Sequence, residues 1–321
     1  MFNDDTIGAI SGSGAIGLGS STLSIGANNL NTTFSGVASG TGGLTKVGTG
    51  TLTLSGVNTY SGSTKVSAGT LDILGSLNNQ TAVEIDANAI YKLSNSSSIG
   101  SLSGSGSVFS SSDENSHLLT VGSNNASSEF SGVISGTGAL TKVGSGVFTL
   151  SGDNTYTALT DIQAGTLRLV GSLYASPLGL NVSEGAQYEL GADVQHESLT
   201  GSGDIKLGSN VLTLQNFGDS SSFNGSIQGS GGIIKDGPSK FVLTGVNTYT
   251  GSTTISDGEL EISGSLSDET DVFVGESATY VVAVGDTIAS LSGRGTINLG
   301  SSSLIAGGDS STEFSGVASG S

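Results

Sequence analysis

The sequence has no cysteine and no tryptophan, and only two of its 321 residues are proline. The absence of cysteine excludes disulfides, thiolate metal sites and cysteine nucleophiles. No apolar run approaches the ~20 residues that a membrane-spanning helix needs, and the acidic stretch of residues 1–10 is too short for a signal peptide. If the parent protein is exported, we expect this chain to be a piece of it.

Positive charge is scarce. Nine Lys and Arg stand against 27 Asp and Glu, which gives a formal net charge of −18. A nucleic-acid-binding protein needs a basic face to displace counterions from phosphates, so we expect no nucleic acid partner. With a mean hydropathy of +0.11 and 11% charged residues, the chain is too apolar and too weakly charged for a disordered tail. We therefore expect it to fold.

Glycine is abundant, with 53 residues, but it lacks the every-third-residue spacing of collagen. Instead one pattern, ISGSG at residues 10–14, returns as LSGSG at 102–106, LTGSG at 199–203 and LSGRG at 291–295. The offsets of 92 to 97 residues predict three repeat units, 7–98, 99–195 and 196–287, and a partial fourth, 288–321. We interpret residues 1–321 as a fragment of a single solenoid.

Within a unit, apolar residues alternate with polar ones in runs of three to six residues, a pattern typical of short strands. The middle position of the triplets 71–73, 167–169 and 260–262 is Asp, Arg and Glu in turn, so we expect it to face water. About four rungs of ~20 to 30 residues fit each unit. The sequence therefore predicts an all-β parallel β-helix (β-solenoid), an elongated rod of roughly 14 rungs spaced ~4.8 Å apart.

One segment also resembles a known family. Residues 42–71, GGLTKVGTGTLTLSGVNTYSGSTKVSAGTL, return with changes at 138–167 and 231–260. They resemble the autotransporter-associated β-strand repeat, also called the passenger-associated transport repeat. The resemblance implies a passenger domain of a type V secreted protein of Gram-negative bacteria, with a right-handed β-helix displayed at the cell surface or secreted. It also implies that the parent carries an outer-membrane β-barrel.

Three kinds of side chain recur at equivalent positions of these segments. Asparagines that precede a tyrosine are expected to cap turns, and the tyrosines are expected to be half-buried anchors rather than a sugar-binding platform. Lysines in an acidic protein are expected on a solvated face that offsets carboxylate repulsion, with ligand binding as the alternative. These repeat positions are Asn58, Asn154 and Asn247, then Tyr60, Tyr156 and Tyr249, and then Lys46, Lys142 and Lys235. Tyr91, Tyr188 and Tyr280 recur as well, and we expect the same structural role for them.

No residue set predicts catalysis, a cofactor or a metal site. His117 and His196 are too far apart in sequence to share a proton relay. Seven carboxylates crowd residues 257–276, where calcium is one interpretation, but the GGxGxDxUx pattern is absent and a hydrated acidic face is favoured. A polysaccharide-cleaving β-helix would need paired carboxylates, and Asp161 or Glu261 would form such a pair only by accident.

The function favoured by these patterns is an adhesin or self-association scaffold, with repeats that also support secretion and folding. Its partners would be a host glycan or protein, or like passengers on neighbouring cells, bound weakly at many places. A passive stalk that presents a distal domain is the first alternative. A polysaccharide-cleaving enzyme is the second.

Overall fold

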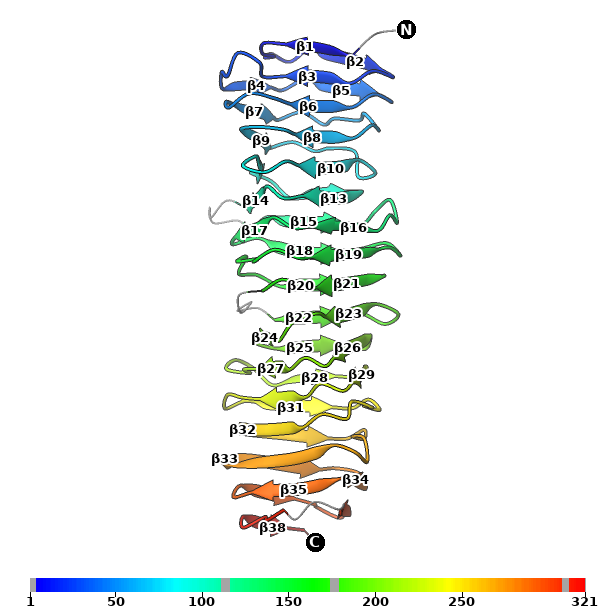
Figure 1. Ribbon diagram of the computed structural model, residues 1–321, viewed down its shortest axis with the longest axis vertical. Helices are drawn as coiled ribbons and strands as arrows, with labels where there is room; N and C mark the ends of the chain where they lie inside the picture. Colours follow the sequence, from blue (N-terminus) through cyan, green and yellow to red (C-terminus); the bar gives the residue numbers. More distant parts are fainter. Residues whose placement is uncertain (1–3, 111–115, 174–178, 308–311, 321) are drawn as a thin grey trace. The chain divides into compact units, whose positions relative to one another are not determined.

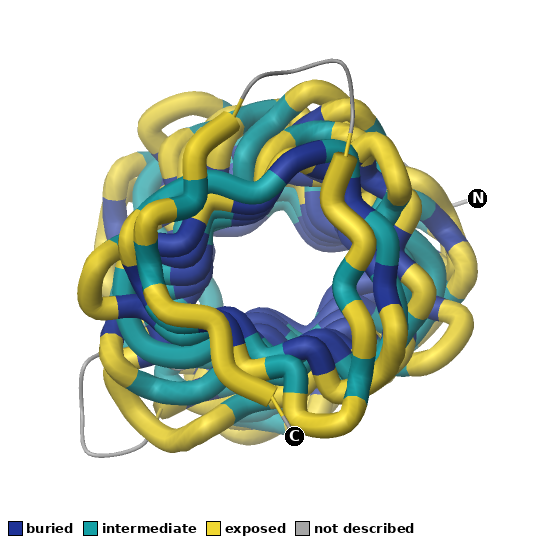
Figure 2. The backbone as a smooth tube through the Cα atoms, turned by 90° about the horizontal axis from the view of Figure 1, so that it is seen from below, coloured by how far each residue is buried: buried dark blue, intermediate teal, exposed yellow. Residues whose placement is uncertain are grey.

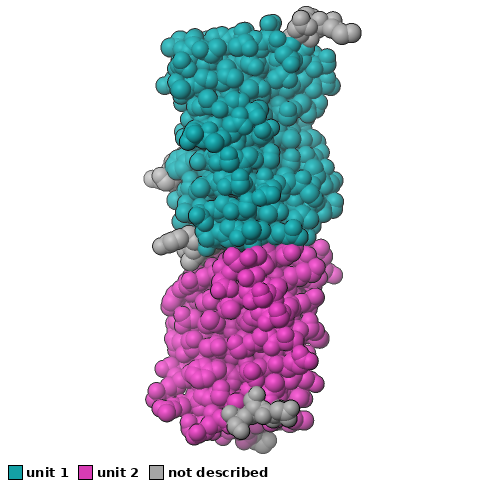
Figure 3. All heavy atoms as spheres, viewed as in Figure 1, with its two compact units in different colours: residues 1–160, 165–174 teal, residues 161–164, 175–321 magenta. Residues whose placement is uncertain are grey.

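The computed structural model describes residues 4–110, 116–173, 179–307 and 312–320 (Figure 1). Throughout these ranges the regular structure consists of strands, and no helix that could cross a membrane is present in them. The chain divides into two compact units, residues 1–160 with 165–174 and residues 161–164 with 175–321 (Figure 3). Each unit is described by itself below.

The strands are short, mostly of three to five residues. Those whose residues lie in the first unit are β1 (Asp5–Ile7), β2 (Ala15–Gly19), β3 (Leu23–Ile25), β4 (Thr32–Phe34), β5 (Val37–Gly40), β6 (Leu44–Lys46), β7 (Thr51–Leu54), β8 (Thr64–Val66), β9 (Thr70–Ile73), β10 (Ala82–Ile85), β11 (Ile90–Leu93), β12 (Ser97–Ile99), β13 (Ser101–Gly104), β14 (Ser107–Ser110), β15 (Leu118–Val121), β16 (Ser128–Phe130), β17 (Val133–Gly136), β18 (Ala139–Lys142), β19 (Val147–Leu150) and β21 (Thr166–Leu169). The division between the units falls within β20 (Thr160–Ile162).

Two strands of the second unit are longer, β32 (Thr253–Ile262) and β33 (Asp271–Val282). The others are β22 (Leu180–Val182), β23 (Gln187–Leu190), β24 (Val194–His196), β25 (Leu199–Gly201), β26 (Asp204–Gly208), β27 (Leu212–Leu214), β28 (Ser221–Phe223), β29 (Ser226–Gly229), β30 (Ile233–Lys235), β31 (Lys240–Leu243), β34 (Asp286–Ile288), β35 (Ser290–Gly293), β36 (Thr296–Asn298), β37 (Leu304–Ala306) and β38 (Val317–Ser319).

In both units the strands pair in parallel with strands that lie one coil away along the chain. In the first unit Thr32 of β4 pairs with Leu52 of β7, and Leu52 pairs with Leu71 of β9. In the second unit Leu212 of β27 pairs with Ile233 of β30, which pairs with Thr253 of β32. One coil therefore takes about 20 residues, and the described strands form about 15 turns where roughly 14 were expected. The predicted all-β parallel solenoid is confirmed, and its right-handedness stays a prediction.

The apolar residues of each coil point inward, as the alternating sequence predicts. In β7, Leu52 and Leu54 are 1% exposed, whereas Thr51 and Thr53, which alternate with them, are half-buried. Buried positions line the inside of the coils and exposed positions the outside (Figure 2). The prediction that Asp72 faces water is wrong, since it is only 8% exposed. The paired residue Lys92 covers it, with Nζ 3.1 Å from the Asp72 carboxylate.

Stacked glycines allow successive coils to approach closely at one corner. A Cβ at Gly36 would lie 1.7 Å from the carbonyl oxygen of Gly14, and one at Gly56 would lie 2.0 Å from that of Gly36. Gly75 repeats this contact against Gly56 at 2.1 Å. Any side chain would therefore push the coils apart, which explains why glycine returns at this corner in coil after coil.

Candidate functional site

The recurring lysines lie inside the solenoid, so the solvated face that we expected for them is wrong. Lys46 and Lys142 are 1% exposed and Lys235 is fully buried. The ammonium of Lys46 donates hydrogen bonds to the carbonyls of Val47 at 2.8 Å, Gly48 at 2.8 Å and Ala68 at 3.1 Å. Ala68 belongs to the next coil, so one side chain closes its own turn and ties it to its neighbour.

The other two lysines also donate to main-chain carbonyls of their own turn. Lys142 donates to the carbonyls of Val143 at 2.7 Å and Gly144 at 2.8 Å. Lys235 donates to Gly237 at 2.7 Å and to Asp257, one coil on, at 3.1 Å.

The turn around each lysine contains glycines with positive φ, among them Gly48 at 69° and Gly144 at 68°. These conformations direct carbonyl oxygens toward the ammonium.

Burial lowers the pKa of all three lysines, and it lowers the pKa of Lys142 to about 8. The carbonyl oxygens oppose this effect because they favour the charged ammonium over the neutral amine. Their positions inside the coil leave these lysines no access to a ligand in solution. Strand alternation carried the signal for this placement, because Lys46 follows Leu44 by two residues and therefore shares its inward side.

The recurring asparagines bind the backbone of their own turn and of both neighbouring coils. The Asn58 side-chain oxygen accepts from the amide of Ala38 at 3.1 Å. Its amide group donates to the carbonyls of Gly56 at 3.1 Å and Ser76 at 3.2 Å. Asn154 and Asn247 make the equivalent bonds. All three side chains are buried, in line with a turn-forming role.

The recurring tyrosines are fully buried rather than half-buried, which corrects that expectation. Tyr60, Tyr156 and Tyr249 are at most 1% exposed, and each hydroxyl pairs with the threonine hydroxyl four residues on, at 2.6 to 2.7 Å. Burial raises the pKa of each phenol. Tyr91, Tyr188 and Tyr280 are equally buried. None of the six rings is available to stack on a sugar.

The two histidines lie in different units, His117 in the first and His196 in the second. The Nε2 atom of His196 lies 3.2 Å from the Tyr188 hydroxyl, and the two rings meet edge to face. Burial lowers the pKa of His196 to about 4, so its ring is neutral at pH 7. This histidine is a core residue.

The acidic stretch of residues 257–276 is partly neutralised by Lys240, whose Nζ lies 2.8 Å from Glu259 and 2.5 Å from Glu261. Within the part of the chain that the structure describes, no group of three His, Cys, Asp or Glu residues could hold a metal ion.

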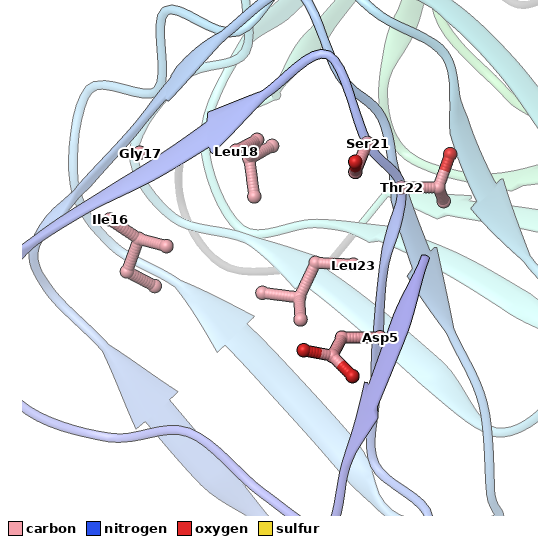
Figure 4. Close-up of a pocket in the computed structure, with 7 residues that line it drawn as sticks. All are labelled: Asp5, Ile16, Gly17, Leu18, Ser21, Thr22 and Leu23. Atoms are coloured by element: carbon pink, nitrogen blue, oxygen red, sulfur yellow. The ribbon is translucent and has the colours of Figure 1, made fainter. Parts of the chain in front are cut away.

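Hollows in the described surface include four of about 160 to 410 Å³, and the smallest and the largest of these four lie in different units. The smallest, of about 160 Å³, lies in the first unit beside β1, β2 and β3, where Ile16, Leu18, Leu23 and Asp5 point into it (Figure 4). Among the described residues of its lining, Asp5 is the one titratable group. The largest, of about 410 Å³, lies in the second unit and is a groove lined by Phe273, Glu276, Gly293, Arg294, Glu313 and Ser315.

The groove brings together residues that the sequence analysis did not single out. Phe273 is 45% exposed on β33, and Arg294 directly follows β35. A comparison of the repeat units position by position would have found the signal, because an aromatic stands at an outward position where the earlier units have Glu84 and Asn181.

Comparison with known proteins identifies the repeated segments. The passenger-associated-transport-repeat family matches residues 44–73, 140–169 and 233–262, and each match contains one of the buried lysines, asparagines and tyrosines. An alignment of 337 positions covers 94% of the chain and shows 36% identity to a protein named adhesin BmaC autotransporter from Brucella suis biovar 1 (strain 1330). It spans 9% of the length of that relative. No solved structure matches the chain.

Proposed function

We propose that this chain, which belongs to the autotransporter passengers that carry passenger-associated transport repeats, acts as an adhesin outside the bacterial cell. The observation that carries the proposal is the identity of 36%, over 94% of the chain, to a protein named an autotransporter adhesin.

The outer side of the coils supports a role in weak, repeated contacts. Its side chains include hydroxyls, amides and carboxylates, as at Thr53, Asn181 and Glu84, while the recurring lysines and tyrosines are buried. Weak contacts that recur along a solenoid add up by avidity without one strong pocket. The partner in this proposal is a host glycan or protein, or a like passenger on another cell. The charge of −18 argues against nucleic acid.

In the test, the full chain is coupled to beads. The attachment of these beads to host cells, and of the beads to one another, is then measured. We expect attachment that rises steeply with the density of the chain on the bead, because avidity depends on the number of simultaneous contacts. Beads that fail to attach to cells or to one another at every density would overturn the adhesin proposal and favour the passive stalk.

A second role, support of secretion and folding, is favoured by the lysine contacts. Lys46 and Lys235 each bind carbonyls of their own coil and of the next one, so a folded coil offers a template for the coil that follows. Replacement of Lys46, Lys142 and Lys235 by methionine in the parent protein is the test. We expect less passenger at the surface but unchanged attachment per displayed molecule, whereas unchanged display would refute the role.

We propose no enzymatic activity for the chain. A polysaccharide-cleaving enzyme would release new reducing ends, and we expect none from neutral or acidic oligosaccharides incubated with the chain. Release that depends on Glu276 or Glu313, the two carboxylates in the groove, would reverse this conclusion.

A further inference from the structure

The groove of the second unit lies on a path of three coils that occurs three times in the chain. The same backbone pairing joins a valine or isoleucine, a glycine and a phenylalanine in successive coils. The three sets are Ile85, Gly104 and Phe130, then Val182, Gly201 and Phe223, and then Val274, Gly293 and Phe314. The first two sets are internal references for the third.

The side chains around this path differ sharply in the third set. The position of Arg294, directly after the glycine, is occupied by Ser105 and Ser202 in the other sets. The position of Gly275, directly after the valine, is occupied by Asp86 and Ser183. Compared with the other two sets, the third set therefore has a guanidinium at Arg294 and no side chain at Gly275. It also has an aromatic ring at Phe273 in place of a polar side chain.

The backbone holds these groups at fixed positions on three neighbouring coils. The amide of Arg294 donates to the carbonyl of Val274 at 3.0 Å, and the amide of Gly293 donates to that of Glu313 at 3.2 Å. The amide of Ser315 in turn donates to Gly293 at 2.9 Å. Rigid coils therefore place an aromatic face, a guanidinium and two carboxylates around one hollow of about 410 Å³, within the usual range of small-molecule sites.

We propose that this groove binds a neutral sugar residue of a glycan, an inference that rests on the proposed adhesin function and supplies its ligand class. The exposed face of Phe273 offers an apolar platform for the C–H face of a sugar ring. The planar fork of Arg294 donates to sugar hydroxyls, and the carboxylates of Glu276 and Glu313 accept from them. A polyhydroxylated ligand satisfies both kinds of group because each hydroxyl donates and accepts.

The charge of the site selects against acidic sugars. Among the described residues of the lining, two carboxylates outnumber the single guanidinium, and the whole chain has a charge of −18. A sialylated or uronic acid ligand would meet a repulsive potential, whereas a neutral sugar pays no such cost.

The test titrates the full chain with lactose, maltotriose and mannotriose, and with sialyllactose and trilysine as acidic and basic comparisons, by NMR. We expect saturable binding of at least one neutral sugar. Phe273→Ala should weaken it about tenfold, and Phe273→Trp should preserve it. Arg294→Lys, which keeps the charge but loses the fork, should weaken it as well.

The matched control is Phe109→Ala, which removes a 38% exposed phenylalanine from β14 in the first unit and should leave binding unchanged. Absence of saturable binding to all three neutral sugars, equal affinity in Phe273→Ala, or preference for sialyllactose or trilysine would overturn the inference. Bead attachment is measured in parallel on the Phe273→Ala chain. Attachment without sugar binding by the unmodified chain would leave the adhesin proposal intact while the groove proposal fails.

Discussion

Lys46 combines two properties that rarely occur together, a side chain 1% exposed and an amino group whose three hydrogen-bond acceptors are all main-chain carbonyls. Its three acceptors are main-chain carbonyls, which would otherwise be left without donors inside a turn. The amino group of Lys46 therefore supplies the donor that these carbonyl oxygens need. The same solution at Lys142 and Lys235 explains why this residue recurs in all three repeats.

Lys46→Met should therefore lower the free energy of unfolding by about 3 kcal/mol, since the carbonyl oxygens lose a charged donor and stay buried. Lys65→Met is the matched control, because Lys65 is an exposed side chain paired with Glu84 and Asp86 and should cost less than about 1 kcal/mol. Urea unfolding followed by circular dichroism measures both. Equal effects of the two substitutions would contradict the role assigned to the carbonyl contacts.

We expect the stability of the folded chain to depend on pH through His196. Its pKa of about 4 in the folded chain lies below the ordinary value of 6.5, so the unfolded chain binds more protons between these pH values. Stability should fall as the pH drops from 6.5 to 4, by about 3 kcal/mol from this residue. His196→Leu should lack this component, and the difference between the two urea titrations isolates it from the carboxylates they share. A difference that stays constant with pH would refute the assignment.

The sequence could place single residues only as far as alternation and repetition reach. Period two puts Leu52 and Leu54 inside, and it puts Lys46 inside as well, but the carbonyls that accept from its ammonium are not visible without the turn geometry. Asp72 sits at an outward position and is still covered, because the covering residue Lys92 comes from the next coil. The error at Asp72 arises from a neighbour 20 residues away in sequence, whereas the error at Lys46 arises mainly from the geometry of its own turn.

Between coils, the stacked glycines set the distance of closest approach. Gly56→Ala should destabilise the first unit by about 2 to 3 kcal/mol, because the new methyl group would meet the carbonyl oxygen of Gly36. Gly14→Ala is the matched control in the same stack, since a Cβ there meets nothing within 4 Å, and it should change stability by less than about 0.5 kcal/mol. Thermal unfolding of the two variants distinguishes steric exclusion from a general loss of glycine flexibility, which would affect both equally.

Strands and their parallel stacking were predictable because the period-two pattern and the repeat are properties of the sequence itself. The groove was not, since Phe273, Arg294 and Glu313 lie in three different coils and become neighbours only through the pairing of β33 with β35 and of Gly293 with Phe314.

For the whole chain, the predicted repeat units indicate which segments can be deleted without loss of folding. Deletion of residues 99–195 removes one complete predicted unit and should leave a chain that folds, because equivalent strands then pair across the junction. Deletion of residues 99–185 removes about half a coil less and would bring non-equivalent strands together. We expect resistance to limited proteolysis and a strand-type circular dichroism spectrum for the first deletion, with both lost in the second. Similar behaviour of the two would contradict the unit boundaries.

The enclosed lysines also affect how the chain withstands its surroundings. Trypsin-type proteases cut after lysine and arginine, of which the chain has nine, and three of these are sealed within the coils. Lys65, Lys92 and Lys240 are held by carboxylates. An enzyme of this specificity would therefore find few accessible places to begin cutting the folded chain.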